Sequence, residues 1–185
     1  MRHQQTQSLP DEARWRLRGL GLSPRKALGQ HFLVSAQVLE SILEAAELGP
    51  QDVVVEVGPG LGMVTRELAH RVARVVAVEL DGELAAALAQ DLRSASNVQV
   101  LHADARKVEP RKLLGGDIPY KVVANLPYYA ANPILRRFLE APWKPSLLVV
   151  MVQREVAQSM AASPGRMSLL AVSVQFYGRP RIVAY

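Results

Sequence analysis

The stretch VVVEVGPGLG at residues 53–62 carries the strongest structural signal in the chain. Its first half is a run of β-branched residues, which is typical of a strand buried on both faces. Three glycines follow with the spacing Gly-x-Gly-x-Gly, at Gly58, Gly60 and Gly62. Glycine after a strand lets the backbone approach a ligand, and a following helix presents an electropositive N-terminus. The stretch predicts a strand, a ligand-binding turn and a helix, although purely structural turns also use glycine.

Strand and helix patterns alternate on both sides of this stretch. Strands are expected at residues 53–57, 75–79, 98–101, 121–124 and 147–152. Helices are expected at residues 11–20, from the N-cap Ser35 through Ala46, and at residues 65–72, 82–92 and 133–139. Residues 167–176 alternate like a strand, but their apolar stripe favours a helix, with a short strand from Arg181. This alternation predicts an α/β domain with a mostly parallel sheet and helices on both faces.

Composition and charge narrow the class of protein. The 185 residues are 49% hydrophobic and 21% charged, which disfavours disordered and fibrous chains. No apolar run approaches the roughly 20 residues that cross a bilayer, and no secretory signal opens the chain. The absence of cysteine excludes a disulfide framework and is compatible with a cytoplasmic location.

The formal net charge of +5 comes from the two ends of the chain. Residues 1–31 sum to +4, residues 32–140 to −3 and residues 141–185 to +4. Such a distribution suggests a polyanionic partner such as nucleic acid, although a solvated basic face would give the same sums.

Carboxylates stand at the ends of the second and third expected strands. Glu79 ends its strand nineteen residues after Gly60, where a carboxylate can accept hydrogen bonds from both ribose hydroxyls. Asp104 follows the next strand, at the edge where open α/β sheets bind ligands. Glu79 could instead cap a helix, and Asp104 could be a turn residue. Together with Gly58 they favour a nucleoside site, whereas the glycine spacing disfavours a nicotinamide dinucleotide.

The fourth strand ends in Asn125-Leu126-Pro127-Tyr128, next to the expected nucleoside. This segment suits methylation of an exocyclic amine, a poor nucleophile because its lone pair is delocalised into the base. The Asn125 side-chain oxygen and the Pro127 carbonyl would accept hydrogen bonds from the amine and favour a tetrahedral nitrogen. Tyr128 and Tyr129 would stack on the base, and catalysis would need no carboxylate base. A plain strand-exit turn is the alternative.

Six motifs, in order, resemble the ribosomal RNA adenine dimethyltransferase family. They are KALGQHFL at 26–33, EVGPGLG at 56–62, VAVELD at 76–81, ADA at 103–105, NLPYY at 125–129 and VQREVA at 152–157. The resemblance covers residues 20–178 and is closer to the small-subunit branch than to the related large-subunit enzymes. It implies a Rossmann-like S-adenosylmethionine-dependent methyltransferase that dimethylates the N6 amines of adjacent adenines in small-subunit ribosomal RNA during ribosome biogenesis.

The resemblance also implies roles for individual residues. S-adenosylmethionine would be bound without a metal. His31 and Leu33 would lie in the segment folded over it, Gly58 and Gly60 under its methionine part, Glu79 at the ribose, and Asp104 and Ala105 at the adenine. Leu80 would also bind the cofactor, and Asn125 would touch both the cofactor and the target amine. The implied partner is small-subunit ribosomal RNA or the assembling subunit, bound by a monomer away from membranes. Arg154 would face RNA by its position, although a solvated face explains it nearly as well.

The chain differs from the family pattern in two places. Residues 130–133 read Ala-Ala-Asn-Pro, where relatives usually place Ser or Thr before the proline. The family also continues past Tyr185 with a last strand and a small helical domain that helps to grip RNA. We therefore expect a basic N-terminal extension at 1–24 and a methyltransferase domain at 25–185 that is truncated at its C-terminal end. A non-catalytic RNA-binding assembly factor with the same fold is the alternative function.

Overall fold

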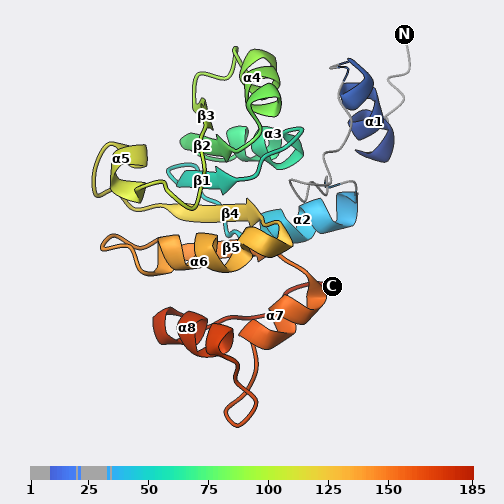
Figure 1. Cartoon of the computed structure of the whole chain (residues 1–185). Coiled ribbons are helices and arrows are strands. Elements are labelled where there is room, and N and C mark those ends of the chain that lie inside the picture. Colours follow the sequence, from blue (N-terminus) through green and yellow to red (C-terminus); the bar gives the residue numbers. More distant parts are fainter. Residues whose placement is uncertain (1–8, 20, 22–32, 34) are drawn as a thin grey trace.

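One parallel sheet organises the chain. The computed structural model describes residues 9–19, 21, 33 and 35–185, and within them five strands form the sheet (Figure 1). They are β1 Val53–Val57, β2 Arg74–Glu79, β3 Val98–His102, β4 Lys121–Asn125 and β5 Leu147–Met151. Their order is β3-β2-β1-β4-β5, with every neighbouring pair parallel. The order therefore reverses between β1 and β4, where doubly wound sheets bind their ligands.

Helices cover both faces of this sheet. Within the same ranges they are α1 Leu9–Gly19, α2 Ala36–Ala45, α3 Met63–Ala69, α4 Gly82–Asp91, α5 Pro110–Leu114, α6 Ala131–Leu139, α7 Arg154–Met160 and α8 Leu169–Tyr177, with a 3₁₀ turn η2 at Tyr128–Ala130. Figure 1 shows α7 and α8 beyond β5, where α8 contacts α6 and α7. Each of these helices is too short or too polar to cross a membrane.

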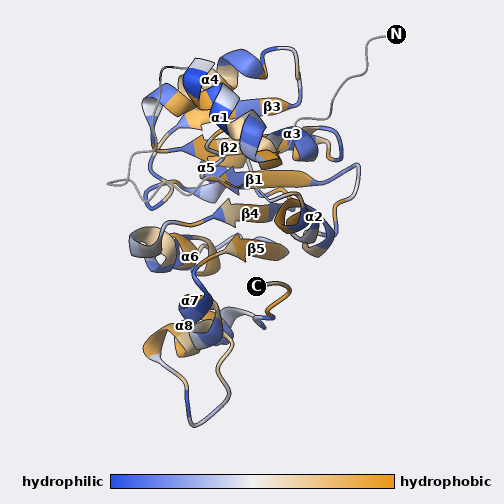
Figure 2. Cartoon of the chain, turned by 90° about the vertical axis from the view of Figure 1, so that its right-hand side faces the viewer, coloured by the Kyte–Doolittle hydropathy of each residue, from blue (hydrophilic) through white to orange (hydrophobic). Residues whose placement is uncertain are grey.

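Successive valines of β1, β2, β4 and β5 enter different hydrophobic cores. Val54 packs in a core with residues of α2 and α3, whereas Val55 packs in a second core with residues of α5 and α6. Both faces of the sheet are therefore buried, which explains why its strands read as runs of valine rather than as alternating patterns. Figure 2 shows the strands as an apolar layer between helices that also carry hydrophilic residues.

The predicted doubly wound α/β fold is confirmed, and most of its elements lie where they are expected. Ser35 is the N-cap of α2, because its Oγ accepts a hydrogen bond from Val38 N at 3.3 Å. The helix expected near the end of the chain forms as α8, and Ser168 is its N-cap. The short strand predicted from Arg181 is wrong, since residues 178–185 form no regular element. Within the described residues β5 pairs with β4 alone, so the segment at Arg181 does not add a strand to the sheet.

Candidate functional site

A pocket opens at the carboxyl ends of the strands, where the strand order reverses. The residues predicted to bind the cofactor that line this pocket are Leu33, Gly58, Gly60, Glu79, Leu80, Asp104, Ala105 and Asn125. The structure thus brings together residues from five separate segments of the sequence. His31 lies outside the described residues. The described part of the chain contains no cluster of three histidine or carboxylate side chains that could hold a metal ion.

The turn after β1 needs glycine for its backbone shape. Gly58, Gly60 and Gly62 have φ angles of 71°, 54° and 75°, a left-handed region that other residues rarely adopt. A Cβ atom at Gly58 would lie 2.9 Å from the backbone oxygen of Asn125. The first glycine therefore lets β1 turn beside the end of β4, so that the two predicted site segments lie next to each other.

Glu79 connects the end of β2 to this glycine turn. Its Oε2 accepts a hydrogen bond from Gly60 N at 3.0 Å, and its Oε1 accepts one from Asp81 N at 2.9 Å. Burial raises the pKa of the Glu79 carboxyl, and these backbone hydrogen bonds oppose the shift. The N-cap of α4 is Asp81, not Glu79, which excludes the helix-cap alternative. A carboxylate has about four acceptor positions, so Glu79 can still accept a ligand hydroxyl beside its backbone hydrogen bonds from Gly60, Asp81 and Leu80.

Asp104, just after β3, is held by a residue that the sequence did not single out. Arg106 Nε lies 2.9 and 3.1 Å from the two Asp104 carboxylate oxygens, and Arg106 Nη2 lies 2.7 Å from Oδ2. The backbone N–H of Arg106 also donates to Asp104 Oδ1 at 3.0 Å. These hydrogen bonds hold the pKa of Asp104 below its ordinary value. Both residues line the pocket, so the site contains a cation that pattern reasoning missed.

The segment that leaves β4 forms a turn at Pro127. Asn125 and Pro127 line the pocket as expected. The Pro127 carbonyl oxygen, however, accepts hydrogen bonds from the backbone N–H groups of Ala130 and Ala131, both at 3.0 Å. These two bonds use the lone pairs of the Pro127 oxygen to close the turn into α6. The Pro127 oxygen therefore already serves the turn into α6, and the Asn125 side chain is the other predicted acceptor for a target amine.

The other residues of this segment take different positions. The side chain of Leu126 is buried in the core, with 6% of the residue exposed. Tyr128 begins η2, but its side chain lies outside the part of the chain that the structure describes. Tyr129 lines the pocket and is 48% exposed, which places it at the rim. An exposed aromatic ring beside a pocket can stack on a base that has left its helix.

Glu56 is a buried carboxyl in the pocket wall to which the sequence assigned no role. It lies in β1 and is only 3% exposed, and burial raises the pKa of its carboxyl to about 8. Among the described residues, Glu56 Oε2 and the neighbouring Thr65 Oγ1 make no hydrogen bond of good geometry, although the Thr65 hydroxyl lies close enough to the carboxyl to oppose the rise in its pKa. Buried polar atoms are normally satisfied, so these two mark a place for a ligand group or an ordered water.

Comparisons with known protein sequences agree with one another. A family model described as "Ribosomal RNA adenine dimethylase" matches residues 21–184. A protein named Ribosomal RNA small subunit methyltransferase A from Dehalococcoides mccartyi is 52% identical over 179 residues, which cover 97% of this chain and 62% of that protein. A protein of the same name from Moorella thermoacetica is 46% identical, over 90% of this chain and 62% of that protein. The chain therefore spans about three fifths of the length of these relatives.

Solved structures with a similar fold include two methyltransferases. The crystal structure of the 23S rRNA methyltransferase ErmE superposes with a TM-score of 0.66 and 36% identity, over 77% of this chain and 56% of that chain. A dimethyladenosine transferase from Plasmodium falciparum superposes with a TM-score of 0.68 over 78% of this chain and 52% of that chain. Its identity of 24% supports the shared fold alone.

Proposed function

Because the chain belongs to the ribosomal RNA adenine dimethylase family, we propose that it contributes the methyl-transfer site of a small-subunit ribosomal RNA adenine dimethyltransferase. The reaction would place two methyl groups from S-adenosylmethionine on the N6 amine of each of two adjacent adenines. The observation that carries this proposal is the single pocket in which Gly58, Glu79, Asp104 and Asn125 meet. Family membership supports the type of reaction, and the pocket is the candidate site for it.

The pocket residues suit S-adenosylmethionine, which would supply the methyl group when bound. Glu79 would accept hydrogen bonds from the ribose hydroxyls through the lone pairs that its backbone contacts leave. Asp104 would accept one from the adenine amine, beside the apolar surface of Ala105. The glycine turn would approach the methionine part without side chains in the way. Leu33 and Leu80 would add apolar contacts at the pocket wall.

The remaining residues would handle the target adenine. Asn125, at the end of β4, would accept a hydrogen bond from the target N6 amine and turn its lone pair toward the methyl donor. Tyr129, at the rim, would stack on the base. Such catalysis rests on positioning, because the N6 proton becomes acidic once the nitrogen has formed its bond to the methyl group and is positively charged, and water can then remove it.

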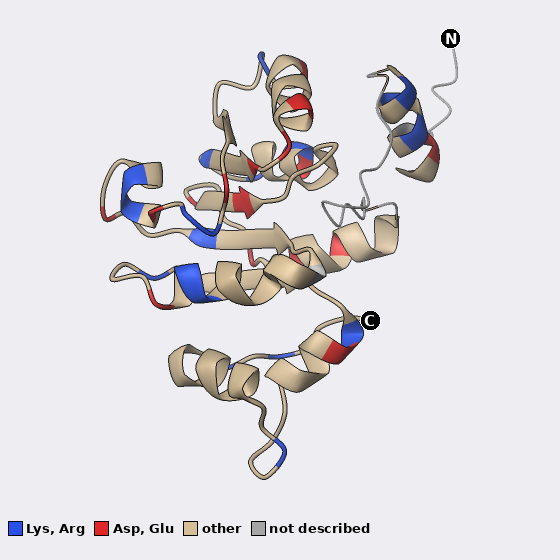
Figure 3. Ribbon diagram, in the orientation of Figure 1, with Lys and Arg blue, Asp and Glu red and all other residues tan. Residues whose placement is uncertain are grey.

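The proposed partner is the RNA of the assembling small subunit. Lys and Arg lie on α1, α5 and α6, outside the sheet (Figure 3). Cations of this kind contact phosphates without reading sequence. The ErmE likeness makes large-subunit RNA a second candidate target, but the 52% identical relative covers nearly the whole chain and is named for the small subunit. Transfer of labelled methyl groups to unmodified small and large subunits would decide between them, and repeated turnovers would exclude a purely non-catalytic assembly role.

A change at Glu79 tests the cofactor site directly. Calorimetry with S-adenosylhomocysteine should show binding by the folded chain, and Glu79→Gln should weaken it about tenfold, as expected for a lost charged hydrogen bond. A glutamine amide presents one acceptor oxygen where the glutamate presents two. Glu83→Gln, an exposed change in the first turn of α4, is the control and should bind like the parent. Equal affinity in Glu79→Gln would rule out the ribose contact.

A change at Arg106 tests whether its ion pair competes with the adenine. Arg106→Ala should bind S-adenosylhomocysteine about threefold more tightly, because the guanidinium no longer occupies the Asp104 carboxylate and a partly exposed pair is worth little on its own. Lys107→Ala removes a neighbouring cation and serves as the control. Weaker binding by Arg106→Ala would instead show that the arginine itself holds the ligand.

A further inference from the structure

Helix α1 packs on the outside of the glycine turn, although residues 20–57 lie between them in the sequence. Ala13 of α1 is 3% exposed and forms a small core with Leu61 of the turn and Leu84 of α4, which are 5% and 3% exposed. Leu17 of α1 packs against the same core. Removal of α1 would therefore expose apolar side chains of the turn that approaches the cofactor.

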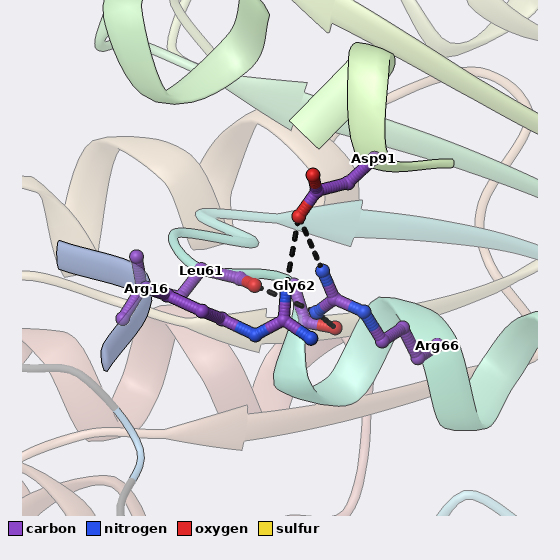
Figure 4. Close-up of polar contacts among 5 residues, drawn as sticks. All are labelled: Arg16, Leu61, Gly62, Arg66 and Asp91. Atoms are coloured by element: carbon purple, nitrogen blue, oxygen red, sulfur yellow. Dashed lines mark hydrogen bonds and ion pairs between the residues drawn. The ribbon is translucent and has the colours of Figure 1, made fainter. Parts of the chain in front are cut away.

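Two arginines and one aspartate join α1 to the same turn, and we call them the Arg16–Asp91–Arg66 cluster (Figure 4). Asp91 Oδ2, at the end of α4, accepts hydrogen bonds from Arg16 Nη1 at 2.8 Å and from Arg66 Nη2 at 3.0 Å. Arg66 Nη1 donates to the backbone oxygens of Leu61 and Gly62, both at 2.7 Å. The chain of contacts thus runs from α1 through Asp91 and Arg66 to the backbone of the turn.

This cluster is more confined than an ordinary surface ion pair. The side chains of Arg16 and Arg66 are only 18% and 22% exposed, and both contact the same oxygen of Asp91, whose side chain is 47% exposed. Partly desolvated pairs are screened less by salt than exposed ones. Because both arginines donate to the same Asp91 oxygen, a shift of Arg16 on α1 changes the position of Asp91 and with it the contact to Arg66, which holds the turn.

The glycine turn is a wall between two spaces. Gly60, Leu61 and Leu84 line both the candidate cofactor pocket and a second cleft that Trp15 and Arg16 of α1 help to form. From the pocket side, Glu79 Oε2 holds Gly60 N. From the other side, Arg66 holds the next two carbonyls. The turn is therefore held by Glu79 on one side and by Arg66 on the other, and Arg66 is itself held by Asp91.

We propose that docking of α1 through the Arg16–Asp91–Arg66 cluster positions the glycine turn for S-adenosylmethionine, so that docking and binding favour each other. This inference rests on the proposed function and adds α1 to the cofactor site. Asp91 is not among the residues that line the pocket, so it acts as a positioning residue. Linkage requires the effect to be reciprocal: a cluster that strengthens binding must itself be strengthened when the cofactor binds.

Calorimetry with S-adenosylhomocysteine on the chain and on Asp91→Ala tests the first half of this linkage. Asp91→Ala should bind about fivefold more weakly, the lower end of typical coupling between sites. Asp117→Ala is a matched control, because its carboxylate is similarly exposed at 44% and also pairs with an arginine, Arg111, at 3.3 Å. Arg16→Gln should weaken binding in the same direction, and it leaves the Asp91–Arg66 contact in place in case Asp91→Ala folds poorly. Asp91→Glu should restore part of the affinity.

Amide hydrogen exchange in α1 tests the second half. Binding of S-adenosylhomocysteine should slow exchange in α1 of the parent and of Asp117→Ala, and should leave α1 of Asp91→Ala unchanged, which a merely stabilising ion pair would not produce. If the parent binds but Asp91→Ala and Arg16→Gln bind equally well, or α1 exchange in the parent does not respond, the inference is overturned and the proposed function stands. If the folded parent does not bind at all, the proposed cofactor site is overturned as well.

Discussion

Replacement of Asn125 by alanine is expected to slow methyl transfer to unmodified small subunits by about 100-fold or more, the loss seen when an oriented catalytic hydrogen-bonding group is removed. The Asn125 side chain would provide the acceptor that turns the amine toward the methyl group, whereas the Pro127 carbonyl already accepts the two hydrogen bonds of the turn into α6. Initial rates with labelled S-adenosylmethionine would measure the effect. Calorimetry with S-adenosylhomocysteine should change far less, because Glu79 and Asp104 would carry most of the cofactor contacts.

The position of Asn125 makes this test interpretable. Its backbone is fixed by the register of β4 with β5, where it lies opposite Met151, and by the close approach of Gly58. Truncation of the side chain therefore leaves the strand end in place and removes mainly the polar group. Asn132→Ala, an exposed change on α6, is the matched control and should transfer methyl groups like the parent. Equal rates for Asn125→Ala and the parent would exclude the amine-acceptor role.

The sheet could be predicted from local patterns because its strands are buried on both faces. The run Val53–Val57 forms β1 as expected, since only a fully covered strand tolerates so many valines. The elements α5 and η2 were missed because five and three residues complete too few helical turns to show a period, and α7 was missed as well. The strand expected from Arg181 fails for a different reason, because a strand needs a neighbour and local sequence cannot show whether one is present.

The site could be predicted where position along a strand determines it. Glu79 and Asp104 lie at the pocket because the carboxyl ends of parallel strands share one edge of the sheet. Side-chain pairing could not be predicted in the same way. Such contacts depend on rotamers and on segments that meet only in the folded chain. Examples are the hydrogen bonds from Arg106 to Asp104, those that close the turn at Pro127, and the one from Arg16 to Asp91.

The free energy of unfolding is expected to fall as pH rises from about 5 to about 8, because of Glu56. Its pKa is about 8 in the folded chain and would be near 4.5 in the unfolded chain. Between these values the folded state binds the extra proton, so the stabilisation is complete below pH 4.5 and is lost as pH rises through 8. One such proton gives a slope of up to about 1.4 kcal/mol per pH unit. Carboxylates with a lowered pKa, such as Asp104, titrate below this range.

Glu56→Gln isolates this contribution, because glutamine has nearly the same shape and no proton to lose. Urea unfolding at pH 5, 6.5 and 8 should show a markedly flatter pH dependence for Glu56→Gln than for the parent, with a gain of a few kcal/mol over the parent at pH 8. A smaller slope should persist, because burial also raises the pKa of Glu79. Glu67→Gln, on the outer side of α3 beside Arg71, should keep the parent's slope. Identical slopes in Glu56→Gln and the parent would mean that the Glu56 carboxyl is ionised in the folded chain across this pH range.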